Sequence, residues 1–199
     1  MKFTKFYQYF FISIAVIAVD QIVKMAVHFS MAEGEHFEVL GDLFKIHYIT
    51  NEGMAFGLKL GGDYGKIILS LFRLMAIFFI GFYIKRLFDK KSHKGLLVCV
   101  ALIFGGAMGN LIDSTFYGLI DPVNLQVFDS PTPWFHGKVV DMFFIDIAEG
   151  YYPSTWPLVG GQHYSFWPIF NIADASIFIA VGLILFRQKT FFKQNEEEA

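Results

Sequence analysis

Four long apolar segments constrain this chain more than any other feature of its sequence. They cover roughly residues 7–27, 67–88, 95–112 and 168–186, and about 20 helical residues cross the ~30 Å hydrocarbon core of a membrane. Because backbone N–H and C=O groups inside a bilayer must be satisfied within the protein, we predict four transmembrane α-helices. The composition agrees, since 55% of the residues are hydrophobic and only 17% are charged, against about 25% charged in soluble domains.

The chain is predicted to form one polytopic membrane domain over residues 1–199, because no Ser/Pro-rich linker divides it. A cleavable signal peptide is an alternative interpretation of the first segment, which follows Lys2 and Lys5. A small-x-small cleavage motif is missing, however, and three more apolar segments follow, so a retained helix is favoured. The tail, about 193–199, is predicted to be disordered.

Basic residues flank alternate ends of the four segments. The larger set consists of Lys2, Lys5, Lys85, Arg86, Lys90, Lys91, Lys94, Arg187, Lys189 and Lys193. The two other connections, 28–66 and 113–167, carry only Lys45, Lys59, Lys66 and Lys138. The positive-inside rule therefore predicts that both termini lie in the cytoplasm and that the two large loops face outward.

The two outer loops have different predicted structures. In the first, polar and apolar residues alternate around 37–40 and 43–50, which predicts a β-hairpin on the membrane surface. In the second, the segment 143–152 is predicted to be a short amphipathic helix at headgroup level. Aromatic residues of this loop suit the membrane interface; they are Trp134, Trp156, Trp167, Tyr151 and Tyr152.

Acidic residues gather at the outer ends of these segments. Asp20 and Lys24 lie one helical turn apart on one face of the first segment, and Asp113 closes the third. Asp174 lies six residues inside the fourth segment, about 9 Å deep at 1.5 Å per residue. Asp141 stands between apolar neighbours and is expected to be half-buried. Because carboxylates in a membrane are costly and usually functional, their common depth indicates a site.

Structural and functional roles compete for each of these acids. Asp20 and Lys24 are interpreted as an ion pair that fixes the first helix, whereas Asp113 either caps its helix or joins the site. Asp141 and Asp174 have no basic residue directly beside them in the sequence, and two such carboxyls in apolar surroundings share one proton. A pair with one proton activates water with one member and protonates a carbonyl oxygen with the other, which is aspartyl peptidase chemistry.

Other functions find less support. The six His residues form no metal-ligand set, so no metal or other cofactor is predicted, and the net charge of −2 does not indicate nucleic acid. A Ser–Lys pair stays open, with Ser70 as the nearest serine. Proton-coupled transporters also use buried acids, but here the acids lie near one side of the membrane and no inverted repeat is visible. A non-catalytic membrane scaffold is a further alternative.

Polar and small residues at the same depth complete the candidate site. Asn110 and Asn171 are predicted to hydrogen-bond an acid or a substrate backbone, since buried amides need partners. Asn51 and Gly53 belong to a turn whose backbone is able to approach a substrate. The glycines of Gly105–Gly109 lie four residues apart and allow another helix to come close.

Five short motifs resemble, in order, those of the lipoprotein signal peptidases, also called signal peptidase II. They are Asp20–Lys24, Asn51–Gly57, Gly105–Asp113, Val139–Phe143 and Phe170–Asp174. Each motif is weakly specific, but five in the family order on four apolar segments make a strong resemblance that runs across nearly the whole chain.

The resemblance implies an all-α membrane protein of four transmembrane helices, with a small extracytoplasmic β-cradle and a periplasmic surface helix. It implies an aspartyl endopeptidase with Asp141 and Asp174 as the catalytic pair. Its substrates would be prolipoproteins with a diacylglyceryl-cysteine, cleaved before that cysteine near the periplasmic face and among membrane lipids. The cyclic peptide globomycin would inhibit it, and a monomer would suffice. Supporting residues would be Asp20, Lys24, Asn51, Gly53, Asn110, Asp113 and Asn171.

The chain departs from the family pattern in four places. Ser114 follows Asp113 where Arg is frequent, so an expected salt bridge is missing and the supporting role of Asp113 is in question. Val23 replaces a frequent Thr near Lys24. The stretches 119–138 and 146–167 are longer than in many members, and we expect them to cover the site or to tune substrate choice.

Overall fold

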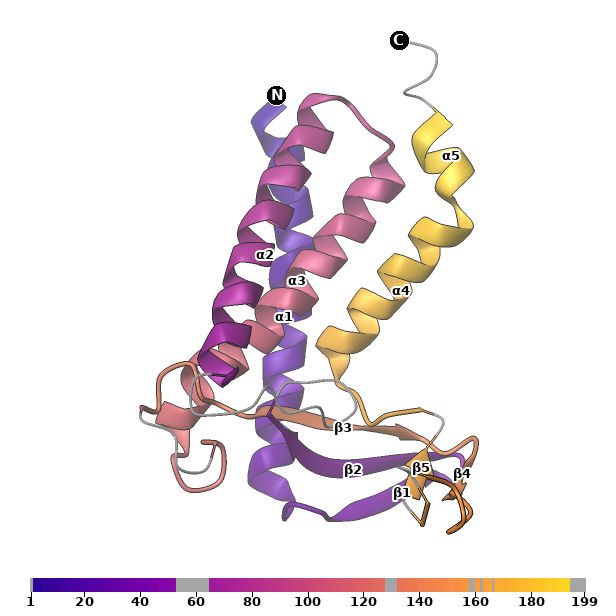
Figure 1. Ribbon diagram of the computed structural model, residues 1–199. Coiled ribbons are helices and arrows are strands. Elements are labelled where there is room, and N and C mark those ends of the chain that lie inside the picture. Colours follow the sequence, from indigo (N-terminus) through magenta and orange to yellow (C-terminus); the bar gives the residue numbers. More distant parts are fainter. Residues whose placement is uncertain are drawn as a thin grey trace.

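The computed structural model describes residues 2–52, 65–127, 132–157, 160–161, 163–165 and 167–193. The helices stand side by side, and a small sheet lies across one end of them, opposite the start of α1 and the short α5 (Figure 1). The helices are α1 (Lys2–Ser30), α2 (Gly65–Asp89), α3 (Lys94–Ile120), α4 (Ile172–Phe186) and the short α5 (Gln188–Phe192). The strands are β1 (His36–Leu40), β2 (Phe44–Asn51), β3 (Val139–Ile145), β4 (Glu149–Tyr151) and β5 (His163–Ser165). The predicted disordered tail beyond Lys193 lies outside the described residues.

Among the described residues, α1, α2 and α3 are long and apolar enough to cross a membrane. α3 is the central helix, because α1, α2 and α4 all pack against it. Large apolar side chains such as Phe11, Phe72, Phe78 and Phe178 remain exposed on the outer faces of α1, α2 and α4. Such contiguous apolar surface is expected of helices that face lipid rather than water.

The fourth predicted helix is shorter than expected. It was predicted over 168–186, but α4 begins at Ile172 and has 15 residues, which is below the length of a typical membrane span. The backbone of Phe170 pairs with Phe143 instead of joining the helix, and the Asn171 side chain caps α4 by accepting the Asp174 N–H. Asp174 therefore lies in the first turn of α4, and its predicted depth of six residues is wrong.

The third helix is longer than expected. Its predicted end was residue 112, but α3 continues to Ile120, so Asp113 lies within the helix and does not close it. The helix continues because its last two turns are buried against the loop and sheet: Ser114, Thr115, Tyr117 and Gly118 are all buried. The buried amine of Lys24 pairs with the Asp113 carboxylate inside the helix.

β1, β2 and β3 form an antiparallel sheet in the order β1-β2-β3, and the predicted hairpin between β1 and β2 is confirmed. The predicted amphipathic helix over 143–152 is wrong, because this stretch holds the end of β3 and the whole of β4. The β-branched and aromatic run Val139–Ile145 pairs with β2 along its length, and such residues fit a half-buried pleated surface. In the described residues between α3 and α4, no surface helix is present.

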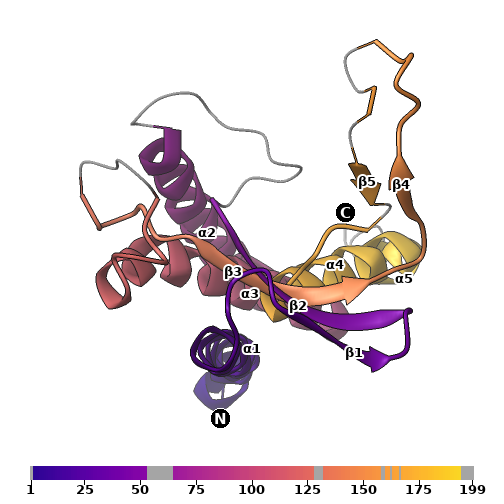
Figure 2. The same ribbon diagram turned by 90° about the horizontal axis from the view of Figure 1, so that it is seen from below.

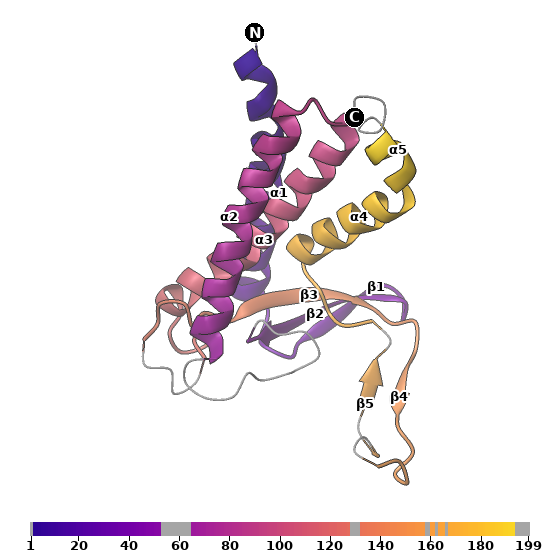
Figure 3. The same cartoon turned by 45° about the horizontal axis from the view of Figure 1, so that its top comes forward.

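β4 and β5 form a separate antiparallel pair. Figures 2 and 3 show this pair projecting as an arm from the end of β3, away from the helices. Tyr151 on the arm is 73% exposed, and the rings of Tyr152 and Trp156 stack with centroids 5.6 Å apart. The arm falls within the long stretch 146–167, whose predicted role in substrate choice stays a prediction.

Candidate active site

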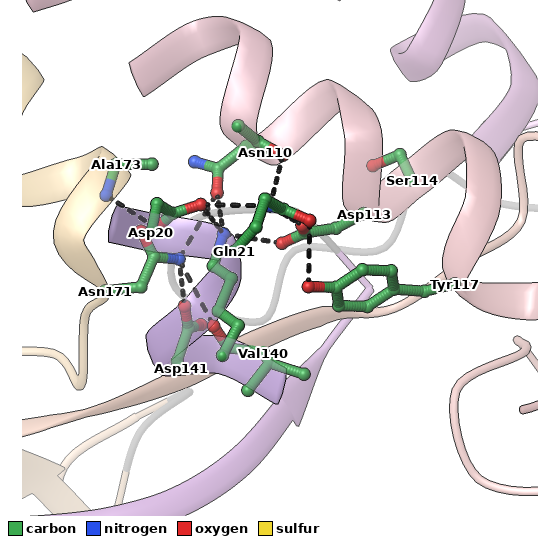
Figure 4. Close-up of polar contacts among 12 residues, drawn as sticks. Asp20, Gln21, Asn110, Asp113, Ser114, Tyr117, Val140, Asp141, Asn171 and Ala173 are labelled. Atoms are coloured by element: carbon green, nitrogen blue, oxygen red, sulfur yellow. Dashed lines mark hydrogen bonds and ion pairs between the residues drawn. The ribbon is translucent and has the colours of Figure 1, made fainter. Parts of the chain in front are cut away.

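The candidate site lies where the sheet meets the ends of α1, α3 and α4 (Figures 1 and 4). Asp141 belongs to the middle of β3, opposite Ile49 of β2, and is only 2% exposed. Its Oδ1 accepts a hydrogen bond from Asn171 Nδ2 at 2.7 Å, and its Oδ2 accepts one from Asn51 Nδ2 at 3.2 Å. β-sheet pairing and two amides therefore fix this carboxyl at the end of the helix bundle.

Asp174 is linked to Asp141 through the same asparagine. Asn171 donates to the Asp141 carboxyl through Nδ2 and accepts the Asp174 backbone N–H through Oδ1 at 2.9 Å. Asn110 of α3 donates to Asp174 Oδ1 at 2.8 Å. Asp174 is half-buried, whereas Asp141 is buried, so the two acids have different access to solvent. The helix cap that starts α4 thus also brings the two acids into one network.

The surroundings of Asp141 favour its neutral form. Burial, followed by the negative charge of Asp174, raises the pKa of Asp141 to about 7, although hydrogen bonds from Asn51 and Asn171 and the Lys24 charge act in the opposite direction. An ordinary Asp has a pKa of about 4. Near neutral pH, Asp141 is therefore able both to hold a proton and to release it.

A buried ion cluster supports this pair from the α1 side. Lys24 Nζ lies 2.8 Å from Asp20 Oδ2 and 2.6 Å from Asp113 Oδ2, and all three side chains are 0% exposed. Gln21 Nε2 donates to Asp113 Oδ1 at 2.8 Å, and the Tyr117 hydroxyl donates to Gln21 Oε1 at 3.1 Å. The predicted Asp20–Lys24 ion pair is confirmed, and Asp113 is its third member (Figure 4).

Asn110 joins the ion cluster to the two acids. Its Oδ1 accepts hydrogen bonds from Lys24 Nζ at 2.9 Å and from Asn171 Nδ2 at 3.2 Å, while its Nδ2 donates to Asp174. Asp20 adds a second connection, because its Oδ1 accepts the Ala173 N–H at 2.9 Å in the first turn of α4. One continuous network therefore runs from α1 through α3 to α4 and β3, and buried networks of this kind fix side-chain orientation.

Glycines of α3 allow this close assembly, as predicted for Gly105–Gly109. A Cβ at Gly109 would lie 2.7 Å from Asp20 Oδ2, and one at Gly106 would lie 2.4 Å from the Ala173 carbonyl oxygen. Both distances are shorter than a Cβ tolerates. The two glycines therefore admit the Asp20 side chain and the start of α4 to the surface of α3.

Eight of the predicted site residues meet in this network: Asp20, Lys24, Asn51, Asn110, Asp113, Asp141, Asn171 and Asp174. Gly53 lies outside the described residues. Lys24 and Gln21 hold the Asp113 carboxylate although Ser114 replaces the expected Arg, and its supporting role stays a prediction.

The Ser–Lys alternative is disfavoured by the contacts of Ser70. Its hydroxyl donates to the backbone oxygens of Lys66 and Phe135, while the Lys66 amine donates to the Glu52 backbone oxygen. In the described part of the chain, no group of three or more His, Cys, Asp or Glu side chains is arranged to hold a metal ion.

Three residues of the network were missed in the sequence. Nothing in the sequence marked Gln21 or Tyr117 as a site residue. An amide near the end of a membrane span is common, and so is an aromatic residue just after one. Arg73 could have been recognised from the sequence, because it is the only charged residue within the apolar segment 67–84. Ionisable residues inside membrane spans are functional candidates by default. Its guanidinium donates to Ser114 Oγ at 2.8 Å.

Fold and site together define a membrane-embedded protein whose polar centre is built from two carboxyls, two amides and a buried ion cluster at one end of a helix bundle.

The chain is similar to known proteins. The family model of signal peptidase (SPase) II, Peptidase_A8, matches residues 12–190. A lipoprotein signal peptidase from Porphyromonas gingivalis is 41% identical over 181 residues, which are 86% of this chain and 77% of the relative. Another, from Amoebophilus asiaticus, is 37% identical over 96% of this chain and 81% of the relative. The chain belongs to the signal peptidase II family.

A solved structure agrees with this assignment. A bacterial membrane enzyme determined by the in meso method at 1.9 Å resolution superposes with a TM-score of 0.58 and 28% sequence identity, over 90% of each chain. The fold of this chain, with three long apolar helices and a small antiparallel sheet, is therefore that of a membrane enzyme.

Proposed function

We propose that this chain is a membrane-embedded aspartyl endopeptidase that removes the signal peptide from diacylglyceryl-modified prolipoproteins by cutting before the lipobox cysteine. Family membership supports lipoprotein processing. The observation that carries the aspartyl mechanism is the joint attachment of Asp141 and Asp174 to Asn171, beside Asn110 and the buried ion cluster.

The proposed reaction uses one proton shared by the two acids. The greater burial of Asp141 favours the proton there, and the half-buried Asp174 acts as the ionised base. Asp174 takes a proton from water as the water oxygen attacks the scissile carbonyl carbon, while Asp141 gives its proton to the carbonyl oxygen. When the C–N bond of the tetrahedral intermediate breaks, the proton held by Asp174 passes to the leaving amine and Asp141 regains its own.

The proposed orientation places the site near the periplasmic face of a bacterial inner membrane, with both termini in the cytoplasm. Basic residues gather at the ends of α2, α3 and α4 that are remote from the sheet. The start of α1 and the short α5 lie at that same end in Figure 1. We include α4 as a fourth span, extended by α5. The partners proposed are prolipoproteins and membrane lipids, globomycin is the expected inhibitor, and a monomer suffices.

The proposed function is tested by cleavage of a defined substrate. The purified full chain in detergent should cut a lipobox peptide whose cysteine carries diacylglycerol, with mass spectrometry locating the cut directly before that cysteine. The same peptide with a free cysteine is the matched control and should be cut far more slowly. Absence of cleavage of the lipidated peptide, or a cut at another bond, would contradict the proposal.

The activity should depend on pH with a bell-shaped profile, because the reaction needs a single proton on the Asp141–Asp174 pair. With the pKa of Asp141 at about 7, activity should fall as pH rises through about 7 and this carboxyl ionises. At lower pH the second carboxyl also binds a proton, and activity should fall again. Initial rates measured from about pH 5 to about pH 9 check this expectation. A rate that stays constant across that range argues against a shared proton.

A further inference from the structure

Arg73 is a cation in an otherwise apolar segment of α2. Its neighbours in sequence, Leu71, Phe72, Leu74 and Met75, are all exposed on the outer surface of the bundle. Arg73 is only partly exposed, and its Nη1 reaches inward to donate to Ser114 Oγ of α3 at 2.8 Å. Ser114 is 0% exposed and directly follows Asp113. The guanidinium therefore lies between α2 and the part of α3 that carries the ion cluster.

The acids that act electrostatically on Arg73 are those of the site. They are Asp113, Asp174 and Asp141, whose negative charges attract the guanidinium. Lys66, seven residues earlier on α2, is a second cation close enough to interact with the charge of Arg73, and the Lys66 amine is bonded to the Glu52 backbone oxygen. Arg73 thus approaches the site from α2, while Lys24 approaches from α1 and is engaged by Asp20 and Asp113.

A charge balance shows why this cation matters. The site holds four acids, namely Asp20, Asp113, Asp141 and Asp174. If Asp141 and Asp174 share one proton, three negative charges remain. Lys24 and Arg73 supply two positive charges against them, and Lys66 lies close enough to interact with Asp113. Loss of Arg73 removes one of these cations. In surroundings of low dielectric, the loss of one such charge favours protonation of the remaining carboxylates.

We propose that Arg73 is a positioning residue that keeps one carboxyl of the Asp141–Asp174 pair ionised at neutral pH through its charge. This role rests on the proposed aspartyl mechanism. Through Arg73, α2 also contributes to the site, although its surface is otherwise apolar. The hydrogen bond to Ser114 fixes the position of the guanidinium. The proposed role depends on that position and not on which helix carries the cation.

The test is the pH profile of kcat/KM for the lipidated peptide. Arg73→Gln keeps a hydrogen-bond donor for Ser114 but removes the charge, so the acid limb should move to higher pH. A unit charge at about 10 Å and an effective dielectric of about 20 corresponds to roughly one pH unit. Activity below the optimum should therefore fall about tenfold, with little loss above it. Arg73→Lys should keep the wild-type acid limb.

Two further variants make the result decisive. Lys85→Gln removes the same charge from the exposed far end of α2, where Lys85 pairs with Asp89, and should leave the profile unchanged. Arg73→Ser combined with Ser114→Arg moves the cation from α2 to α3 and should restore the acid limb, which keeps the test valid if Arg73→Gln folds poorly. An acid limb unmoved in Arg73→Gln, or a loss equal at every pH, overturns the role of Arg73. Failure of the wild-type chain to cleave would instead overturn the proposed function.

Discussion

Asp141→Asn and Asp174→Asn should each lower kcat for the lipidated peptide at least about 1,000-fold, within the range that general acid–base groups contribute. Asn neither takes a proton from water nor donates one to the carbonyl oxygen, so either change removes half of the shared-proton mechanism. In Asp174→Asn the amide oxygen still accepts the hydrogen bond from Asn110. In Asp141→Asn the amide oxygen keeps one of the two bonds, that from Asn171 or that from Asn51, so the fold should persist with a modest loss of stability. Single-turnover rates for the two variants measure the loss.

The control for this experiment is Asp42→Asn, which makes the same chemical change in the turn between β1 and β2. Asp42 is 94% exposed at its side chain and should keep wild-type activity. Thermal unfolding in detergent shows whether each variant is folded. A folded Asp141→Asn or Asp174→Asn variant with more than about a tenth of wild-type kcat would remove that residue from the catalytic pair.

Lys24→Met should destabilise the protein by about 3–5 kcal/mol, the usual result of breaking a buried ion pair by removing one partner. Asp20 and Asp113, both 0% exposed, would then face each other without a cation. Because Asp20 also accepts the Ala173 N–H, the first turn of α4 and the position of Asp174 should be disturbed. The free energy of unfolding from detergent titration measures this loss, and cleavage should fall with it.

A second substitution separates charge from packing in this prediction. Lys24→Met combined with Asp113→Asn removes one of the two facing carboxylates and should recover at least half of the lost stability. Lys85→Met, at an exposed ion pair with Asp89, should change stability by less than about 1 kcal/mol. A Lys24→Met variant as stable as wild type would show that the ion cluster does not hold the helices together.

The parts of the fold that local pattern determines could be predicted from the sequence. Alternation of polar and apolar residues predicted the β1–β2 hairpin, and the length of the apolar segments predicted the helices. The helix ends could not be predicted, because distant partners decide them. Asp113 stays inside α3 since Lys24, 89 residues away, neutralises it, and α4 starts late because Phe170 pairs with Phe143. Val139–Ile145 likewise becomes a strand through pairing with β2.

The candidate site was more predictable than the fold around it. Acids and amides in or beside apolar segments are costly unless they have partners, so their common depth indicated that they meet. The sequence did not predict which atoms of these residues contact one another. The role of Asn171, which both caps α4 and bonds Asp141, depends on the approach of β3 to α4. The contact of Arg73 with Ser114 depends in the same way on how α2 packs against α3.

The placement of charges along the chain also has a consequence for biogenesis. Asp20 and Lys24 pair within one helix, so α1 can enter the bilayer during synthesis before any later segment exists to neutralise it. Arg73 is different, because α2 has no acidic residue before Asp89 at its far end, and its side-chain contact with Ser114 comes from the next helix to be translated. We therefore expect α2 and α3 to leave the translocon as a hairpin, with the guanidinium already sheltered between them.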